Sequence, residues 1–261
     1  MSQAAFIFYI VLSGLAVGSF LNVVIDRLPR GQSIVGVASH CEACQRPVAF
    51  YDLVPLLSYL WLRGRCRYCQ ARIPARLPVV EAATGALFGW TAYQHGASLT
   101  TVVALLGMGF LLVIFFTDLE YRLILNKVVL PGAVLLLALF PFGPIGREQS
   151  LWASYLSGVE GVALGFGVML LIYVASRGGM GEGDVKLGAL IGAVSGFPGV
   201  LATLWYAFVV GGIAALALIG AGKRSRKDMM PYGLFMAGAA IAILLGGENI
   251  YSWYVDLLTR A

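Results

Sequence analysis

A series of apolar segments, each near the length that crosses a bilayer, constrains this chain more than any other feature. The expected spans are residues 4–25, 78–94, 100–117, 128–141, 154–175, 187–198, 200–221 and 234–248. A helix needs about 20 apolar residues to cross the hydrocarbon core, and a spanning backbone must satisfy its own hydrogen bonds. The sequence therefore predicts an all-α polytopic membrane protein with about eight transmembrane helices.

Charge is sparse and unevenly placed. Of all residues 59% are hydrophobic and 12% are charged, whereas soluble domains carry about 25% charged residues. Apart from Arg147 and Arg260, every Lys and Arg falls within residues 26–77, 118–127, 176–186 or 222–228. The positive-inside rule places these four segments in the cytoplasm. The net charge of +5 then reflects topology, and we expect no nucleic-acid partner.

Three domains follow from this reading. The N-terminus lacks a basic region before its apolar run, so we expect a retained first span and not a removed signal peptide. The expected domains are a first transmembrane helix (1–25), a cytoplasmic domain (26–77) and a seven-helix membrane domain (78–261).

All four cysteines lie in the polar segment, as the pairs Cys41-Glu-Ala-Cys44 and Cys66-Arg-Tyr-Cys69. Two such pairs at this separation are typical of a tetrahedral, structural zinc site with four thiolate ligands. A polar segment this short builds little core of its own, so a bound metal would supply folding free energy. The alternatives are free thiols, a redox pair or disulfides, although disulfides are rare in the cytoplasm. His40 adjoins the first pair, and we leave it out because four cysteines complete the ligand set.

Two aspartates are expected at the same membrane face. Asp118 ends an apolar run, and Asp184 follows the glycine-rich stretch between the fifth and sixth spans. Ionisable residues at a bilayer are costly and mark functional sites. Two facing carboxylates share one proton, so one can accept a proton from water while the other polarises a carbonyl group. This pattern favours an aspartic protease.

The aspartates and the glycine-rich run allow other interpretations. Glu120 and Glu182 are rival carboxylates, and a glycine-rich run is often only a flexible loop or a helix contact. The aspartates could serve a transporter or channel as ion or proton sites, or the chain could be a zinc-stabilised scaffold. Against transport, no inverted repeat is apparent and both aspartates lie at one face.

The chain resembles the bacterial type IV prepilin peptidases, membrane proteases of the Gly-x-Gly-Asp class. The motifs that carry the resemblance are GLAVGSFLNVVIDRLP (14–29), both cysteine pairs, PLLS (55–58), LRGRC (62–66), PVVE (78–81), Asp118-Leu119 with ILN (124–126), and GEGDVKL (181–187). Together they span nearly the whole chain. Three positions depart from the family pattern, namely Leu77, Leu125 and the stretch PYGLF (231–235) in place of Pro-Phe-Gly-Pro.

The resemblance implies an activity and its location. Asp118 and Asp184 would form the catalytic dyad, and residues 78–261 the peptidase domain. The substrates would be type IV prepilins or type II secretion pseudopilins, cleaved at the cytoplasmic face of the bacterial inner membrane. Members with the cysteine-bearing domain are typically bifunctional, and also methylate the new N-terminus with S-adenosylmethionine. No Gly-x-Gly-x-x-Gly signature following a strand is present, and a peptidase without methylation remains an alternative.

Several other residues have two readings. Glu81 could bind a substrate ammonium group or be a helix-end charge, and Asn22 could bind a polar group or bond to a neighbouring helix. We expect the basic cluster at 223–227 to contact anionic lipid. Trp152, Tyr251, Trp253 and Tyr254 are expected to form an aromatic belt at the outer boundary.

Overall fold

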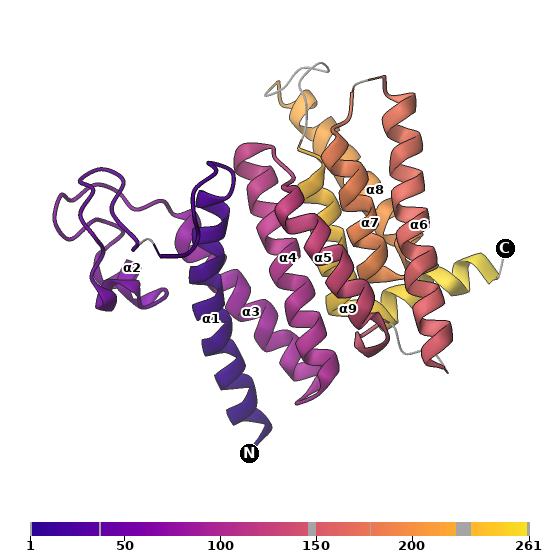
Figure 1. The fold of residues 1–261 in the computed structure, drawn as a ribbon, viewed down its shortest axis with the longest axis horizontal. Coiled ribbons are helices and arrows are strands. Elements are labelled where there is room, and N and C mark those ends of the chain that lie inside the picture. The colour runs from indigo at the N-terminus through magenta and orange to yellow at the C-terminus, as the bar shows by residue number, and fades with distance from the viewer. Residues whose placement is uncertain (1, 37, 146–149, 178, 223–230, 260–261) are drawn as a thin grey trace. The chain divides into compact units, whose positions relative to one another are not determined.

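The computed structural model describes residues 2–36, 38–145, 150–177, 179–222 and 231–259, with side chains described up to residue 246 (Figure 1). Every regular element in these ranges is helical, which confirms the all-α prediction. The elements are α1 (Gln3–Arg27), η1 (Phe50–Leu53), α2 (Leu57–Trp61), α3 (Arg76–His95), α4 (Leu99–Tyr121), α5 (Asn126–Leu139), η2 (Phe140–Phe142), α6 (Leu151–Ala175), α7 (Glu182–Ser195), α8 (Gly199–Gly220) and α9 (Gly233–Thr259). They divide between two compact units, Met1–Ala97 and Ser98–Ala261.

In the first unit, α1 and α3 pack along each other through small residues. A Cβ atom on Gly14 would lie 2.9 Å from the Cα of Gly85, and one on Gly18 would lie 2.7 Å from the Cα of Glu81. Glycine at these positions lets the two backbones approach closely, which is how helices commonly associate in lipid.

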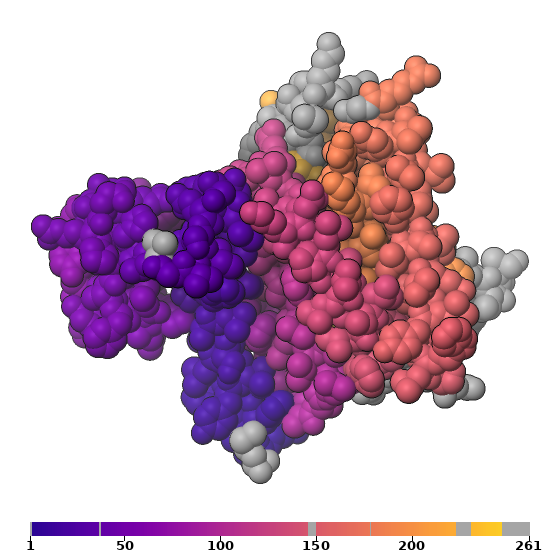
Figure 2. Space-filling model, viewed as in Figure 1, coloured from indigo at the N-terminus to yellow at the C-terminus, as the bar shows by residue number. Residues whose placement is uncertain are grey.

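Among its described residues, the segment between α1 and α3 has η1 and α2 as its only helices, and two isolated β-bridges join its turns. Figure 2 shows it as a lobe beside α1. No residue of η1 or α2 is buried. This segment therefore depends on something other than an apolar core for its structure.

In the second unit, α7 is surrounded by its neighbours. It contacts α5, α6, α8 and α9, and its Leu187, Leu190 and Ile191 are fully buried. Its closest neighbour is α6, where glycines face glycines. A Cβ on Gly161 would lie 2.6 Å from the carbonyl oxygen of Gly192, and one on Gly165 would overlap Gly188. The interface between α6 and α7 is thus backbone against backbone.

In the described parts of the chain, four helices are long and apolar enough to cross a membrane, namely α1, α4, α6 and α8. Two shorter apolar helices are α5 with η2 and the start of α9. Each expected span overlaps one helix, or α5 and η2 together. The sixth span was placed wrongly, because α7 begins at Glu182 and ends at Ser195. Asp184 therefore lies in the first turn of a helix and not in a loop.

Several expectations lie outside the described residues. These are the basic cluster at 223–227, Arg147 and Arg260, and the side chains of Tyr251, Trp253 and Tyr254. Trp152, the remaining member of the expected aromatic belt, is exposed. The division into domains 1–25, 26–77 and 78–261 stays a prediction.

Candidate functional site

The four cysteines come together as the sequence predicted. The Sγ atoms of Cys41, Cys44, Cys66 and Cys69 all lie within 4.8 Å of one another, and those of Cys41 and Cys69 are 3.8 Å apart. Four Zn–S bonds of about 2.3 Å in a tetrahedron put sulfur atoms about 3.8 Å apart. The cluster therefore has the size and the ligand chemistry of a four-thiolate metal site.

The two halves of this cluster are structural repeats, offset by 25 positions from Cys41 to Cys66. In the first half, Cys41 N–H donates to Arg46 at 2.9 Å and Val48 N–H to Ser39 at 2.8 Å. In the second, Cys66 N–H donates to Ala71 at 2.8 Å and Ile73 N–H to Gly64 at 2.8 Å. The glutamine after each pair, Gln45 or Gln70, has a positive φ, of 56° or 59°. We refer to residues 39–48 and 64–73 as the first and second knuckle.

The second knuckle already favours a thiolate. Hydrogen bonds from the backbone N–H groups of Cys69 and Tyr68 lower the pKa of the Cys66 thiol to about 6. The backbone N–H of Ala71 also favours the thiolate of Cys69, but burial and hydrogen bonds with the other thiols raise its pKa to about 11. A metal ion bound by the four sulfur atoms would replace the protons of these thiols.

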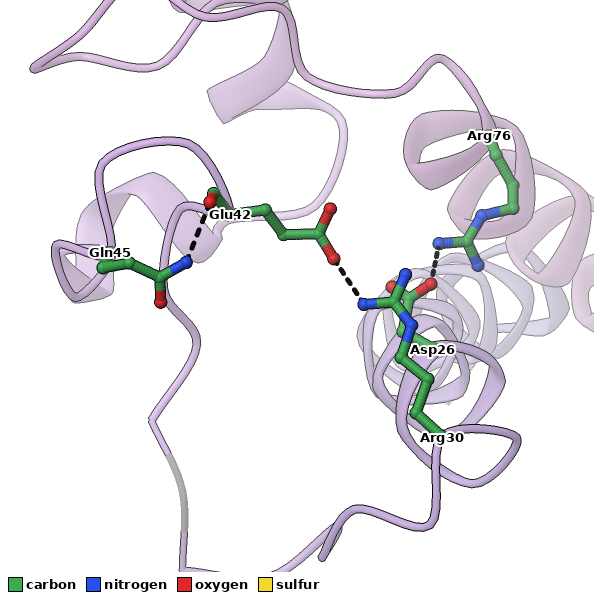
Figure 3. A network of polar contacts seen from close by, with 5 residues as sticks. All are labelled: Asp26, Arg30, Glu42, Gln45 and Arg76. Atoms are coloured by element: carbon green, nitrogen blue, oxygen red, sulfur yellow. Dashed lines mark hydrogen bonds and ion pairs between the residues drawn. The ribbon is translucent and has the colours of Figure 1, made fainter.

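One ion pair links the first knuckle to the end of α1, and another joins α1 to α3 (Figure 3). Arg30, just beyond α1, bonds the carboxylate of Glu42 at 2.7 Å, and the Gln45 side chain donates to the Glu42 carbonyl at 2.8 Å. Asp26 on α1 accepts from Arg76 at the start of α3 at 2.6 Å. Arg30 therefore links the first knuckle to the end of α1, and the Asp26–Arg76 pair links α1 to α3.

A second ion pair holds the other knuckle. Arg67 donates two hydrogen bonds to Asp52 in η1, at 2.8 and 2.5 Å, and this guanidinium lowers the pKa of the Asp52 carboxyl. The guanidinium group of Arg67 thus binds both carboxylate oxygens of Asp52 in a bidentate pair.

Asp118 lies in the last turn of α4 and is 4% exposed. Its Oδ2 accepts a hydrogen bond of 2.8 Å from the backbone N–H of Leu234, at the start of α9. A Cβ on Gly233 would come within 3.0 Å of the same oxygen. The glycine thus allows the α9 backbone to reach a carboxylate that is more than a hundred positions away in sequence.

Asp184 occupies the first turn of α7 and is 9% exposed. Its Oδ2 accepts from the N–H of Gly181 at 3.3 Å, an N-terminal cap that explains why the helix starts before the expected position. The carboxyl groups of Asp184 and Asp118 interact electrostatically. The structure therefore brings the two predicted aspartates together, from two helices of one unit.

Ile124, in the connection from α4 to α5, packs between the starts of α7 and α9. A Cβ on Gly183 would lie 2.7 Å from the Cβ of Ile124, and one on Gly233 would lie 2.8 Å from its Cδ1. Ile124 therefore fixes the starts of both α7 and α9 beside the aspartates. In the sequence, Ile124 and the Pro-Tyr-Gly stretch stand out only as parts of motifs, and no local pattern predicts these contacts.

The rival carboxylates are placed differently. Glu120 is exposed, and Glu182 is exposed and 3.8 Å from Lys186 on the same helix. In the first unit, the Asn22 amide donates to the Leu77 carbonyl at 3.0 Å, which confirms its interhelical reading. Glu81 is buried and accepts from the N–H of Leu56 at 2.9 Å, so its carboxylate holds a loop of its own compact unit.

Comparison with known proteins is consistent across the chain. Residues 12–95 match the model of the bacterial peptidase A24 N-terminal domain, and residues 105–216 match that of the type IV leader peptidase family. A prepilin leader peptidase/N-methyltransferase of Bacillus subtilis is 30% identical over 94% of this chain and 96% of its own length. Proteins of the same description from Pseudomonas putida and Stutzerimonas stutzeri are each 33% identical, over 99% and 97% of this chain and 96% and 94% of theirs. No solved structure matches the chain.

Proposed function

The chain belongs to the type IV leader peptidase family, and from this membership we propose that it cleaves the leaders of prepilins and then methylates the new N-terminus. The observation that carries the proposal is the pair of buried, electrostatically interacting carboxylates, Asp118 and Asp184, on two helices of one unit. Neither Glu120 nor Glu182 is comparably buried.

The proposed reaction uses the two carboxyl groups as an aspartyl dyad. Two interacting carboxylates do not both ionise cheaply, so the proposed dyad holds one proton. The ionised member takes a proton from a water molecule, and the protonated member donates to the oxygen of the scissile carbonyl group. The backbone N–H groups of Leu234 and Gly181 hold the two carboxyls in place. The substrates are type IV prepilins or type II secretion pseudopilins.

The four-thiolate cluster is proposed to hold Zn²⁺ as a structural ion. Cys41, Cys44, Cys66 and Cys69 would be its ligands, and the ion would supply a cross-link between the first and second knuckle. The methyl donor is proposed to be S-adenosylmethionine. Because the described residues form no strand followed by a glycine-rich loop, we assign it no binding residues and derive no step from it.

We propose that all eight expected spans cross the bacterial inner membrane, with residues 26–77 and both aspartates facing the cytoplasm and with lipid around the helices. The Lys and Arg distribution supports this orientation. The α4 span ends beside Asp118, and Asp184 is in the first turn of α7. A prepilin whose apolar segment lies in the membrane would then present its leader junction to the dyad.

The test is leader processing in liposomes, followed by mass spectrometry, with wild type, Asp118→Asn and Asp184→Asn. We expect cleavage by wild type and a loss of at least about 10³-fold in each variant, within the range of general acid–base catalysis. Adding S-adenosylmethionine should increase the product mass by one methylene. Glu182→Gln, which changes an exposed carboxylate two positions from Asp184, is the matched control and should cleave normally.

Cleavage that survives both aspartate substitutions would remove the dyad assignment. Cleavage without the methylene increment would leave a peptidase and remove the methylation. Ion flux that depends on the aspartates, with no cleavage by wild type, would favour the transporter reading instead.

A further inference from the structure

The stretch before α9 contains a polar group that the proposed dyad does not use. The Oη atom of Tyr232 is buried and has no hydrogen-bond partner among the described residues. Burying a hydroxyl without a partner costs free energy, and an orphan of this kind in a folded protein calls for an explanation. The explanation we consider is a partner that arrives with the substrate.

The ring of Tyr232 is held in a fixed place. It stacks on Phe208 of α8, with ring centroids 5.2 Å apart and an interplanar angle of 28°. Its Cε2 also lies 3.5 Å from the point that a Cβ on Gly211 would occupy. The hydroxyl is therefore carried on a ring that α8 positions from one side.

Tyr232 is linked to both aspartates, to one through its side chain and to the other through the next residue of the chain. Tyr232 interacts electrostatically with Asp184, and the next residue, Gly233, is the one that contacts the Asp118 carboxylate. Neither carboxylate takes the tyrosine hydrogen, although each accepts from a backbone N–H, of Leu234 in one case and of Gly181 in the other. Within the described part of the chain, this O–H donor thus has no acceptor.

We propose that Tyr232 is a further catalytic residue, whose hydroxyl donates a hydrogen bond to the oxygen of the scissile carbonyl group. This inference rests on the proposed function. When the water oxygen bonds to the carbonyl carbon, the π electrons of the C=O bond move to its oxygen. One aspartate takes the water proton, and the other donates its proton to that oxygen. A carbonyl oxygen has two lone pairs, so it can accept from the aspartate and from Tyr232 together.

This role matches the general way in which enzymes stabilise developing charge. A donor that is fixed in a buried site before the reaction needs no reorganisation when the oxygen becomes negative. The hydroxyl then contributes to the transition state and not to the resting fold. Its removal should therefore lower the rate without lowering the stability of the protein.

The test compares Tyr232→Phe with Tyr155→Phe in the full-length protein in liposomes. Tyr155 Oη donates to the Ala138 carbonyl at 3.1 Å, so this control removes a satisfied hydroxyl from the same unit. For Tyr232→Phe we expect kcat to fall about 10- to 100-fold, KM to change less than about 2-fold, and the melting temperature to hold or rise. For Tyr155→Phe we expect normal kcat and a lower melting temperature.

A second measurement uses a leader peptide in which a hydroxyethylene group replaces the scissile bond. Tyr232→Phe should weaken its binding about 10-fold and leave the affinity for the cleaved product unchanged. Wild-type kcat in Tyr232→Phe would overturn the inference while leaving the dyad intact, and so would a lower melting temperature with normal kcat. A wild type that cleaves no prepilin would overturn the proposed function, and the inference with it.

Discussion

The four-cysteine cluster and the aspartate pair are built in opposite ways. The cysteines are brought together by two short local turns, whereas the aspartates come from segments far apart in the sequence. Each knuckle is local, since its ligands lie within four residues and its backbone bonds close within ten. The aspartate pair is assembled from distant segments, because Asp118, Ile124, Asp184 and Gly233 belong to four different parts of the second unit. The knuckles form a half-exposed surface lobe, whereas the aspartates are buried. The local site would depend on the proposed ion for its stability, whereas the assembled site depends on helix packing.

The largest expected effect is the unfolding of the cysteine-bearing segment when the proposed zinc ion is removed. Cys41→Ser with Cys66→Ser leaves one thiolate in each knuckle, so we expect complete loss of zinc. Metal binding of this kind contributes about 10 kcal/mol to folding. Limited proteolysis should then cut residues 38–77, while hydrogen exchange in α4 to α8 stays as in wild type.

The matched control is Tyr68→Phe, which changes a knuckle residue that is no ligand. Zinc retained in the double cysteine variant would contradict the proposed four-thiolate site. Loss of protection in α6 and α7 would show that the two sites are not separable.

The aspartate pair should be disrupted by a substitution that disturbs the packing of α7 against α6. Gly192→Ala would place a methyl group against the backbone of Gly161 and Val162. Overpacking typically costs about 1–3 kcal/mol, and here it also displaces the helix that carries Asp184. We expect a lower melting temperature together with slower leader cleavage, measured on the same preparation.

Gly167→Ala on α6 is the control, since nothing lies within 4 Å of a Cβ there. It should be neutral or stabilising by about 0.5–1 kcal/mol, as expected for alanine in place of glycine in a helix. Equal losses in both variants would contradict the role of the interface between α6 and α7.

The smallest expected effect concerns the backbone strain at Gln70 in the second knuckle and the rate of zinc loss. Gln70 has a φ of 59°, a region that costs residues with a Cβ roughly 1 kcal/mol. Gln70→Gly should remove that cost and slow zinc loss to a chelator about 5-fold. Gln70→Ala keeps the Cβ and should give no gain. Faster zinc loss in Gln70→Gly would show that the side chain itself is needed.

Sequence predicted the local site better than the assembled one. The spacing of the cysteine pairs was enough to predict the cluster, because each turn is determined by nearby backbone bonds. Hydropathy was enough to predict the eight helical regions. The start of α7 was misplaced because a cap by Asp184 on Gly181 outweighs the polarity of the first turn. Apolar periodicity does not register such a cap.

The contacts that hold the aspartates were beyond sequence reasoning for a different reason. That Ile124 would touch both Gly183 and Gly233 depends on three connections folding back to one place. Likewise, nothing local indicates that Glu81 accepts from Leu56. Such pairs are determined by tertiary structure, and a single sequence does not carry that information.

The glycine contact between α6 and α7 also limits how a substrate can arrive. With no room for even one methyl group at Gly161, Gly165, Gly188 or Gly192, no side chain of an incoming helix can pass between the two. A prepilin that moves laterally in the membrane therefore cannot reach Asp184 between α6 and α7. Its path of entry must run along another side of α7, and crosslinks placed around α7 would trace it.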